Sequence, residues 1–406
     1  MPFEAPQRTL PRPRDILADF LSGPYLAGAL IGMVFAATAP VAIALAVGTR
    51  GGLSPGDLAS WLFASFFVNG LVTIGMSWWY RQPLVFFWTI PGMVLLGPAL
   101  ARASYPEVIG AFLATGVLML VLGFTGWVRR AMDAVPMPIV MGMVAGVFLR
   151  FGVDLVYAIR DAFPIAAPMV AAFLTLSASA RASRALPPLF GAIIVGAIAV
   201  AVLGRFDTGG AGFTLARPNF YLPQFSLQVM IELVVPLAIT VLVVQNGQGV
   251  AVLRNAGHRP PVDAVTAACG AGSIVTAFMG AVSTCLTGPV SAFVIGAGDR
   301  RGHYAAAILI GLMALVVGLA SPALTGLMLA TPKAFIATLA GLAMLRVLQS
   351  AFAVSFGGRH ALGALVAFLV TVADVPVFTI GAPFWGLVFG YAASRLLERG
   401  DFVRSA

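Results

Sequence analysis

Long apolar runs, separated by short segments rich in arginine, proline or glycine, constrain this chain more than any other feature. Hydrophobic residues make up 60% of the sequence and charged residues only 10%, a composition that does not suit a water-soluble fold. The formal net charge is +9, but the basic residues fall singly or in pairs between apolar runs, which indicates membrane topology and no nucleic-acid partner. The chain is therefore predicted to be an all-α polytopic membrane protein in a lipid bilayer.

Fourteen apolar segments are candidates for membrane crossings, seven on either side of a polar stretch. They are 24–47, 58–78, 84–101, 106–126, 136–152, 162–180 and 186–203, then 227–253, 261–280, 282–298, 304–320, 322–348, 361–373 and 381–397. An odd number of crossings in each half gives the two halves opposite orientations. The sequence therefore predicts an inverted repeat of seven plus seven segments.

The predicted organisation has five parts: an N-terminal tail (1–22), a first repeat (23–204), an extracytoplasmic loop (205–226), a second repeat (227–398) and a C-terminal tail (399–406). Most of the 24 lysine and arginine residues fall in the tails and in the loops on the same side. The positive-inside rule assigns that side, with both termini, to the cytoplasm. The N-terminal tail carries arginines among prolines without an apolar core, so it is not expected to be a signal peptide.

Two segments are interrupted at corresponding places in the two halves. In the third segment, residues 84–90 favour a strand and lead into Pro91, and in the tenth, residues 282–287 do the same before Pro289. Proline suits the first turn of a helix. Each segment is therefore predicted to be a short strand followed by a half-helix. The simpler alternative is a pair of proline-kinked helices without a ligand.

Paired interruptions of this kind point to a transporter binding site. In an inverted repeat both half-helices aim their N-termini at one region near the bilayer midplane. Each N-terminus carries about half a positive charge and unpaired N–H groups, so the site should favour a small anion such as a carboxylate. The residues predicted to bind it at the breaks are Pro91, Gly92, Met93, Thr287, Gly288, Pro289, Val290 and Ser291, with backbone N–H donors at Gly92, Met93, Val290 and Ser291.

Polar residues on two other segments are further candidates. Gln245 and Asn246 interrupt an otherwise apolar eighth segment, and amides at membrane depth are costly unless they face the interior of the bundle. They are predicted to line the substrate cavity, with hydrogen bonding between helices as the alternative. Thr38 lies near the middle of the first segment, where helix packing competes with substrate contact as its role.

Three aromatic residues precede the first break. In a strand, Phe86 and Trp88 would face one side and Phe87 the other, so that one face could contact an aromatic ring, with lipid contact or core packing as alternatives. Carboxylates lie near the ends of the predicted segments, so no proton carrier is obvious. The histidines, His258, His303 and His360, fall in or beside predicted loops and are expected to be solvated.

Other classes of membrane protein fit the sequence less well. An intramembrane enzyme would need a nucleophile with a base, a metal cluster or an acidic diphosphate motif at depth, and the sequence has none of these patterns. Cys269 and Cys285 lie inside predicted spans and suggest neither a disulfide nor a metal site. No enzymatic activity, cofactor or metal is therefore expected. A passive anion channel remains an alternative, although broken helices in two repeats favour alternating access.

Several motifs, in their order and spacing, resemble the benzoate:proton symporter (BenE) family over residues 23–397. They are Tyr80-Arg-Gln-Pro83, Trp88-Thr-Ile-Pro-Gly92, Gly123-Phe-Thr-Gly126, Ala145-Gly146, Leu149-Arg-Phe-Gly152, Gln245-Asn246, Gly249-Val-Ala-Val-Leu-Arg254, Ala256-Gly257 and Pro260-Pro-Val262. The resemblance implies a bacterial inner-membrane protein with the fold of nucleobase-ascorbate transporters and sulfate permeases. In that fold a core domain (segments 1–4 and 8–11) moves against a gate domain (5–7 and 12–14), commonly in a homodimer.

The predicted function is secondary active import of a small organic anion. The resemblance implies benzoate or a related aromatic carboxylate, carried with a proton. Two departures from the family leave the substrate open: residues 38–40 are more apolar than expected, and residues 283–291 are closer to the anion permeases. A sulfate-type transporter therefore remains an alternative. A nucleobase carrier of the same fold is a further one, although Gln245 stands where such carriers place acidic residues.

Overall fold

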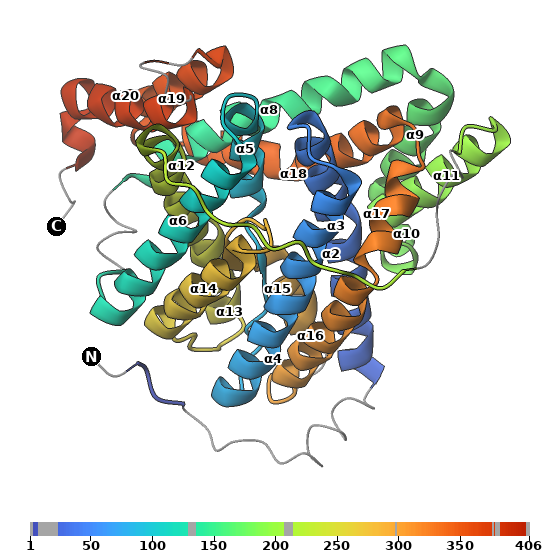
Figure 1. Ribbon diagram of the computed structural model, residues 1–406, viewed down its shortest axis with the longest axis horizontal. Helices are drawn as coiled ribbons and strands as arrows, with labels where there is room; N and C mark the ends of the chain where they lie inside the picture. Colours follow the sequence, from blue (N-terminus) through green and yellow to red (C-terminus); the bar gives the residue numbers. More distant parts are fainter. Residues whose placement is uncertain are drawn as a thin grey trace.

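The computed structural model describes residues 3–6, 23–128, 135–206, 214–296, 299–375, 377 and 382–402. The first half contains α2 (Gly23–Arg50), α3 (Pro55–Phe63), the π-helix η1 (Ala64–Val68), α4 (Asn69–Tyr80), β1 (Phe86–Trp88), α5 (Ile90–Leu100), α6 (Tyr105–Thr125), α8 (Met137–Asp161), α9 (Phe163–Ala178), α10 (Ala180–Ala185) and α11 (Pro188–Val202) (Figure 1). Of the predicted tail 1–22 only residues 3–6 are described, and residues 207–213 and 403–406 lie outside the described part as well.

The second half contains α12 (Leu227–Ile239), the π-helix η2 (Thr240–Asn246), α13 (Gly247–Asn255), α14 (Val262–Ala277), β2 (Thr284–Leu286), α15 (Gly288–Ile295), α16 (His303–Leu319), α17 (Ser321–Leu329), α18 (Lys333–Phe356), α19 (Ala361–Ala373), α20 (Ala382–Leu397) and the 3-10 helix η3 (Arg399–Phe402). Six helical stretches of the described chain are long and apolar enough to cross a membrane, and five apolar helices are shorter. The chain is thus a mostly helical membrane protein.

Most predicted segments coincide with these elements, and α19 has the predicted bounds. The predicted twelfth segment, 322–348, is wrong as one continuous helix. The chain instead forms α17, breaks at residues 330–332, and begins α18 after Pro332, whose missing N–H suits a helix start. The helix α17 is bent by 66° from α16. The count of fourteen crossings stays a prediction.

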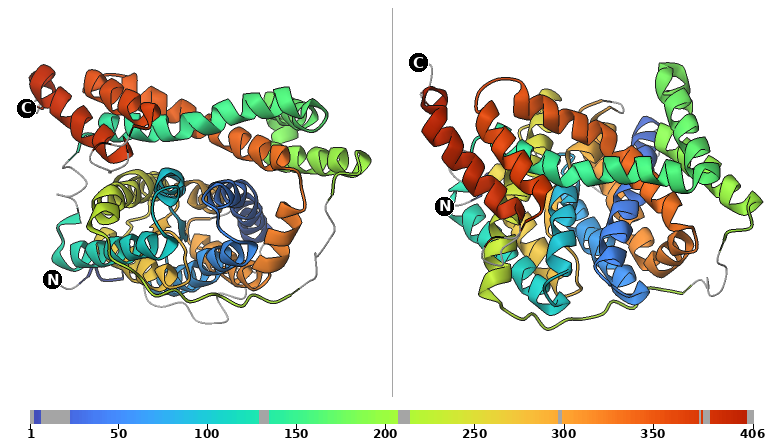
Figure 2. Two further views of the ribbon diagram at one scale, coloured as in Figure 1. Left: turned by 45° about the horizontal axis from the view of Figure 1, so that its top comes forward. Right: turned by 90° about the horizontal axis from the view of Figure 1, so that it is seen from above.

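The helices form two groups. In Figure 2 (left), α8, α9, α11, α18, α19 and α20 lie as one layer beside a bundle made of the remaining long helices. Within the layer α8 packs against α18 and α19, and α11 packs against α9. The layer therefore consists of helices from predicted segments 5–7 and 12–14, whereas the bundle contains both broken segments.

Helices of the bundle pack across the two halves of the chain in a matching way. The helix α6 packs on α14, as α4 packs on α16, and both contacts are made at glycines. A Cβ atom added to Gly116 would lie 3.1 Å from the Gly270 carbonyl oxygen, and one added to Gly70 would lie 2.8 Å from that of Gly311. Small residues let membrane helices approach closely. In an inverted repeat, segment 2 corresponds to segment 9 and segment 4 to segment 11, so the packing of α6 on α14 and of α4 on α16 is the same contact made twice.

The described part of the predicted extracytoplasmic loop, residues 214–226, crosses the ends of the bundle helices as an extended strap (Figure 2). In this strap the Tyr221 hydroxyl donates a hydrogen bond to the Asp57 carboxylate. Burial, together with this bond, raises the pKa of Tyr221. The backbone N–H groups of the strap donate to the bundle at four points: Ala216 to Leu319 O (2.9 Å), Asn219 to Ser60 Oγ (2.9 Å), Tyr221 to Phe278 O (2.8 Å) and Gln224 to Pro106 O (3.0 Å).

Candidate functional site

The two breaks meet as an antiparallel pair of short strands inside the bundle. Phe87 of β1 lies opposite Cys285 of β2, and all six strand residues are buried. The N–H of Thr89 donates to Ser283 O at 3.0 Å, which extends the pair beyond the strands. The prediction of a strand followed by a half-helix is confirmed at both breaks, with strands of three residues that are shorter than predicted.

Helix α4 satisfies the outer edge of β1 with two hydroxyl groups. Thr73 Oγ1 accepts from the Phe86 N–H (2.8 Å) and donates to its carbonyl (3.2 Å). Ser77 Oγ makes the same two contacts with Leu84, at 3.2 and 3.1 Å. Because Thr73 and Ser77 are one helical turn apart, their hydroxyls reach every second residue of the extended chain, Phe86 and Leu84. The helix therefore takes the place of a third strand.

The outer edge of β2 is held by side chains from η2 and α14, and a third side chain, from the start of α4, contacts the Thr284 hydroxyl. Asn246 Oδ1 accepts from the Leu286 N–H at 2.8 Å, and Ser273 Oγ accepts from the Thr284 N–H at 2.9 Å. The Thr284 hydroxyl donates to Asn69 Oδ1 at 2.7 Å. Asn69 follows the π-helix η1 and Asn246 ends η2, and such π turns are frequent at functional sites. Asn246, predicted to line the cavity, thus supports the strand.

At the N-terminus of α5, the capping residue Thr89 takes two backbone donors. Thr89 Oγ1 accepts from the Gly92 N–H at 3.1 Å, and Thr89 O accepts from the Met93 N–H at 2.9 Å. A Cβ atom at Gly92 would lie 2.4 Å from Thr89 Cγ2 and 2.9 Å from Thr240 Oγ1. The donors predicted at Gly92 and Met93 are therefore already engaged, and Gly92 allows close packing.

The N-terminus of α15 is open. Thr287 caps it through its carbonyl, which accepts from the Ser291 N–H at 3.3 Å, whereas its side chain makes no capping bond. The backbone N–H groups of Gly288 and Val290 make no hydrogen bond with the described residues. Ser291 Oγ is fully buried and unpaired there too. The Val290 N–H is therefore open, whereas the equivalent Gly92 N–H of α5 is taken by Thr89. With the Gly288 N–H, the Ser291 hydroxyl and the helix dipole, the first turn of α15 suits an anion.

The eighth segment carries two glutamines, Gln245 in η2, which packs on β2, and Gln248 in α13, which packs on α15. Gln245 is 5% exposed, and its amide makes no hydrogen bond with any described residue. Gln248 follows three residues later and is exposed. A Cβ atom at Gly288 would lie 2.6 Å from Gln248 Cγ and 3.0 Å from Gln248 Oε1. Sequence reasoning selected Gln245 but not Gln248, although both belong to the same polar run, residues 245–249.

The three aromatic residues of β1 are all buried, but they do not alternate as predicted. Trp88 and Phe87 both pack against Phe66, with ring centroids 5.1 and 5.7 Å away, whereas Phe86 belongs to a separate cluster with Tyr80. A strand of three residues is too short to impose regular alternation on its last side chain. Trp88 Nε1 is buried without a hydrogen-bond partner in the described chain.

The remaining predicted site residues lie at the edges of this region. Thr38 is 9% exposed in α2, and its hydroxyl donates to the Phe35 carbonyl of its own helix at 3.2 Å. The hydroxyl is therefore satisfied within its own helix, and substrate contact by Thr38 stays a prediction. Pro91 and Pro289 lie in the first turns of α5 and α15, as predicted.

The histidines are buried, which corrects the expectation that they are solvated. His258, His303 and His360 are 5%, 4% and 8% exposed. His303 is the first residue of α16, and His360 precedes α19 as its N-cap. His258 Nε2 and His303 Nδ1 lie 3.1 Å apart.

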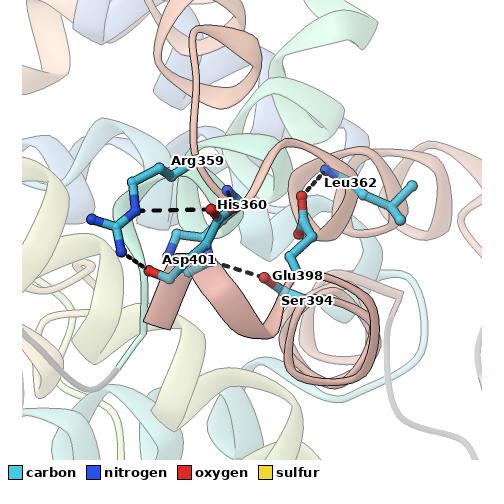
Figure 3. A network of polar contacts seen from close by, with 6 residues as sticks. All are labelled: Arg359, His360, Leu362, Ser394, Glu398 and Asp401. Atoms are coloured by element: carbon cyan, nitrogen blue, oxygen red, sulfur yellow. Dashed lines mark hydrogen bonds and ion pairs between the residues drawn. The ribbon is translucent and has the colours of Figure 1, made fainter. Parts of the chain in front are cut away.

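His360 lies beside Glu398 and Asp401 in a group whose possible metal-ligand atoms are within 4.8 Å of one another (Figure 3). The carboxylates, however, already cap α19. Glu398 accepts from the N–H groups of Leu362 and Gly363, and Asp401 accepts from that of His360. His360 Nδ1 contacts Ser394 Oγ at 2.9 Å. We therefore interpret the group as a capping network that attaches the C-terminal η3 to α19.

Residues 19–396 match the model of a protein family described as benzoate membrane transport protein. The inner membrane protein YdcO of Escherichia coli is 29% identical over 385 residues, which cover 93% of this chain and 94% of YdcO. The benzoate membrane transport protein of Acinetobacter baylyi is 27% identical over 368 residues, which cover 88% of this chain and 91% of that protein.

Solved structures share the fold at low identity. The transmembrane domain of the cyanobacterial bicarbonate transporter BicA superposes with a TM-score of 0.59 at 15% identity, covering 91% of this chain and 98% of that one. SLC26A9 superposes with a TM-score of 0.64 at 14% identity, covering 98% and 72%. The murine anion transporter Slc26a9 in its inward-facing state gives 0.61 at 14%, covering 98% and 73%.

Proposed function

The chain belongs to the benzoate membrane transport protein family, and from this premise we propose that it imports benzoate or a related aromatic carboxylate together with a proton. The family and the fold make it a membrane transporter for a small anion. The observation that carries the proposal is the open N-terminus of α15, where, among the described residues, the N–H groups of Gly288 and Val290 and the Ser291 hydroxyl have no hydrogen-bond partner.

In this proposal the substrate carboxylate binds at the first turn of α15. Two backbone N–H groups and a hydroxyl can donate to it, and the helix dipole favours its charge without a buried arginine. Gln245 and Gln248 orient the carboxylate from the neighbouring helix. The aromatic ring of the substrate contacts the cluster of Phe87, Trp88 and Phe66, where the unpaired Trp88 Nε1 offers one further donor.

Transport follows from movement of the bundle against the layer of α8, α9, α11 and α18–α20. Both strands are hydrogen-bonded to helices of the bundle, so the site moves with the bundle as one body. We assign the bundle as core and the layer as gate, in a seven-plus-seven inverted repeat. The protein is proposed to be a homodimer in the bacterial inner membrane, with both termini in the cytoplasm.

Import of a small inorganic anion is the second candidate. Phe87 and Trp88 are only 4% and 2% exposed, so a ring would have to displace existing aromatic contacts, whereas a compact anion needs only the first turn of α15. This observation favours a sulfate-like or bicarbonate-like substrate.

Uptake of labelled benzoate into proteoliposomes, with and without an inward proton gradient, tests the proposal directly. Benzoate should accumulate only with the gradient, and unlabelled benzoate should compete better than sulfate, bicarbonate or uracil. Competition by sulfate or bicarbonate in the absence of benzoate uptake would establish the second candidate. Flux at channel rates without accumulation would contradict a carrier.

The substitution Gln245→Ala should weaken uptake and leave folding intact. Because a hydrogen bond to a charged group is worth about 1.5–3 kcal/mol, we expect the half-saturating substrate concentration to rise by about tenfold or more. Gln349→Ala on the exposed side of α18 is the matched control and should behave as wild type. Unchanged uptake kinetics in Gln245→Ala would remove this residue from the site.

A further inference from the structure

A pocket of about 510 Å³ opens at the ends of α4 and α13. One wall is the described piece of the N-terminal tail, and another is the turn between α13 and α14. Its lining residues are Glu4, Ala5, Tyr80, Gln82, Arg254, Gly257, His258, Arg259, Pro260 and Pro261. Neither the substrate site nor the proposed transport movement uses this pocket.

The pocket is basic. Arg254 and Arg259 are exposed, and within the described chain neither guanidinium forms an ion pair or another polar side-chain contact. Glu4, the one acidic lining residue, is held at a different place, because its carboxylate accepts from the N–H groups of Asp263 and Ala264 at the start of α14, at 3.1 and 3.2 Å. Two positive charges therefore line the pocket without a partner in the described part of the chain.

The pocket is also built rigidly. Gln82 Nε2 donates to the Arg259 carbonyl at 2.9 Å, and the Arg259 N–H donates to Gln82 Oε1 at 3.1 Å. His258 is 5% exposed, and its N–H donates to the Leu253 carbonyl at 2.9 Å. These contacts fix the last turn of α13, which carries Arg254, and the following turn, which carries Arg259, before any ligand arrives. Such preorganisation lowers the entropy lost on binding.

The neighbouring residues indicate the depth of the pocket in the membrane. Trp78 and Trp79, in the last turn of α4, are 38% and 48% exposed, whereas the adjacent Tyr80 is buried at the pocket. Exposed tryptophans at a helix end are typical of the membrane–water interface. The two arginines are therefore near the level of lipid headgroups, on the face that the positive-inside rule assigns to the cytoplasm.

We propose that this pocket binds the phosphate group of an anionic phospholipid from the adjacent leaflet. Guanidinium groups match phosphate in geometry and charge, and basic pockets on the cytoplasmic side of membrane helices take anionic headgroups. Arg254 and Arg259 hold the phosphate, and the exposed tryptophans lie where the glycerol and acyl chains leave the pocket. The lipid thereby links the end of α13 to the start of α14.

Native mass spectrometry of the full chain in detergent can test this. Short-chain phosphatidylglycerol, short-chain phosphatidylcholine and inorganic phosphate are the probes. We expect phosphatidylglycerol to bind more tightly than phosphatidylcholine, and Arg254→Gln with Arg259→Gln to weaken it by about tenfold or more, because each charge-assisted hydrogen bond lost costs about that factor. Arg346→Gln, on the exposed side of α18, is the matched control and should bind as wild type.

A second variant gives an effect of opposite sign. Glu4→Gln removes the negative charge from the pocket and should tighten phosphatidylglycerol binding by about two- to fivefold, as expected for a partly exposed charge. Binding of inorganic phosphate with the same arginine dependence would support the phosphate site and assign it a soluble ligand. Equal binding of all three probes, or binding that the double arginine variant leaves unchanged in a folded protein, would overturn the proposal.

Discussion

Uptake should be lost when Gly288 is replaced by leucine, while the protein still folds. The leucine side chain would start 2.6 Å from Gln248 Cγ and cover the first turn of α15. Because the nearest atoms belong to a flexible, exposed side chain, the backbone need not move. The open N–H groups of Gly288 and Val290 would, however, be shielded from substrate. A displacement of about 1 Å can cost about 100-fold in rate, so we expect a loss at least that large in proteoliposome uptake.

Gly97→Leu on the other half-helix is the matched control for this variant. A Cβ atom at Gly97 meets no heavy atom within 4 Å, so uptake should stay near the wild-type rate. Gly288→Ala, which displaces only the Gln248 side chain, should give an intermediate loss and keeps the test informative if the leucine variant misfolds. Wild-type uptake by a folded Gly288→Leu protein would contradict the assignment of α15 as the anion site.

A large loss of stability is expected from Asn246→Ala. The Leu286 N–H now donates to Asn246 Oδ1 at 2.8 Å in the buried strand pair. Alanine would leave this N–H without a partner inside the bundle, which costs about 1–3 kcal/mol, and would open a small cavity as well. Uptake should fall too, because β2 leads directly into the open end of α15.

The two cysteines make this loss measurable. Cys269 and Cys285 are the cysteines of the chain, both are fully buried, and Cys269 Sγ lies 3.6 Å from Asn246 Nδ2. A thiol-reactive fluorophore added during heating therefore reports on the unfolding of this region. Asn246→Ala should label at a lower temperature than wild type, whereas Gln245→Ala, one residue earlier, should label at the wild-type temperature. Equal labelling temperatures for all three proteins would contradict the supporting role of Asn246.

Features encoded by local sequence were predicted well. The apolar run of α19 has its predicted ends, and Pro91 and Pro289 begin half-helices after short strands. In both cases composition and proline geometry act over a few neighbouring residues. The single helix predicted over 322–348 failed for a related reason, because the apolar stretch hid a short break before Pro332. A hydropathy pattern cannot distinguish such a break from a continuous span.

Features that depend on distant partners could not be predicted. Whether Asn246 faces a cavity or a strand depends on the position of Leu286, and the Gly92 and Met93 donors are occupied because Thr89 caps α5. The asymmetry between the two half-helices thus comes from one capping side chain. Thr73 and Ser77 were overlooked because isolated hydroxyls in an apolar helix look like ordinary packing residues until the strand beside them is known.

The edges of the strand pair also bear on how the chain is assembled during synthesis. The outer edge of β1 is closed by Thr73 and Ser77, which precede it on the same half, and the backbone of β2 by Asn246 and Ser273 of the second half. Each half can therefore enter the membrane with one strand edge already satisfied. The inner edge of β1 pairs with β2, so its backbone groups stay unpaired until β2 has been translated. Unpaired backbone groups are costly in the bilayer, which favours prompt docking of the two halves. The proposed site, which combines the first turn of α15 with the aromatic residues of β1, is thus complete only when the later half docks on the earlier one.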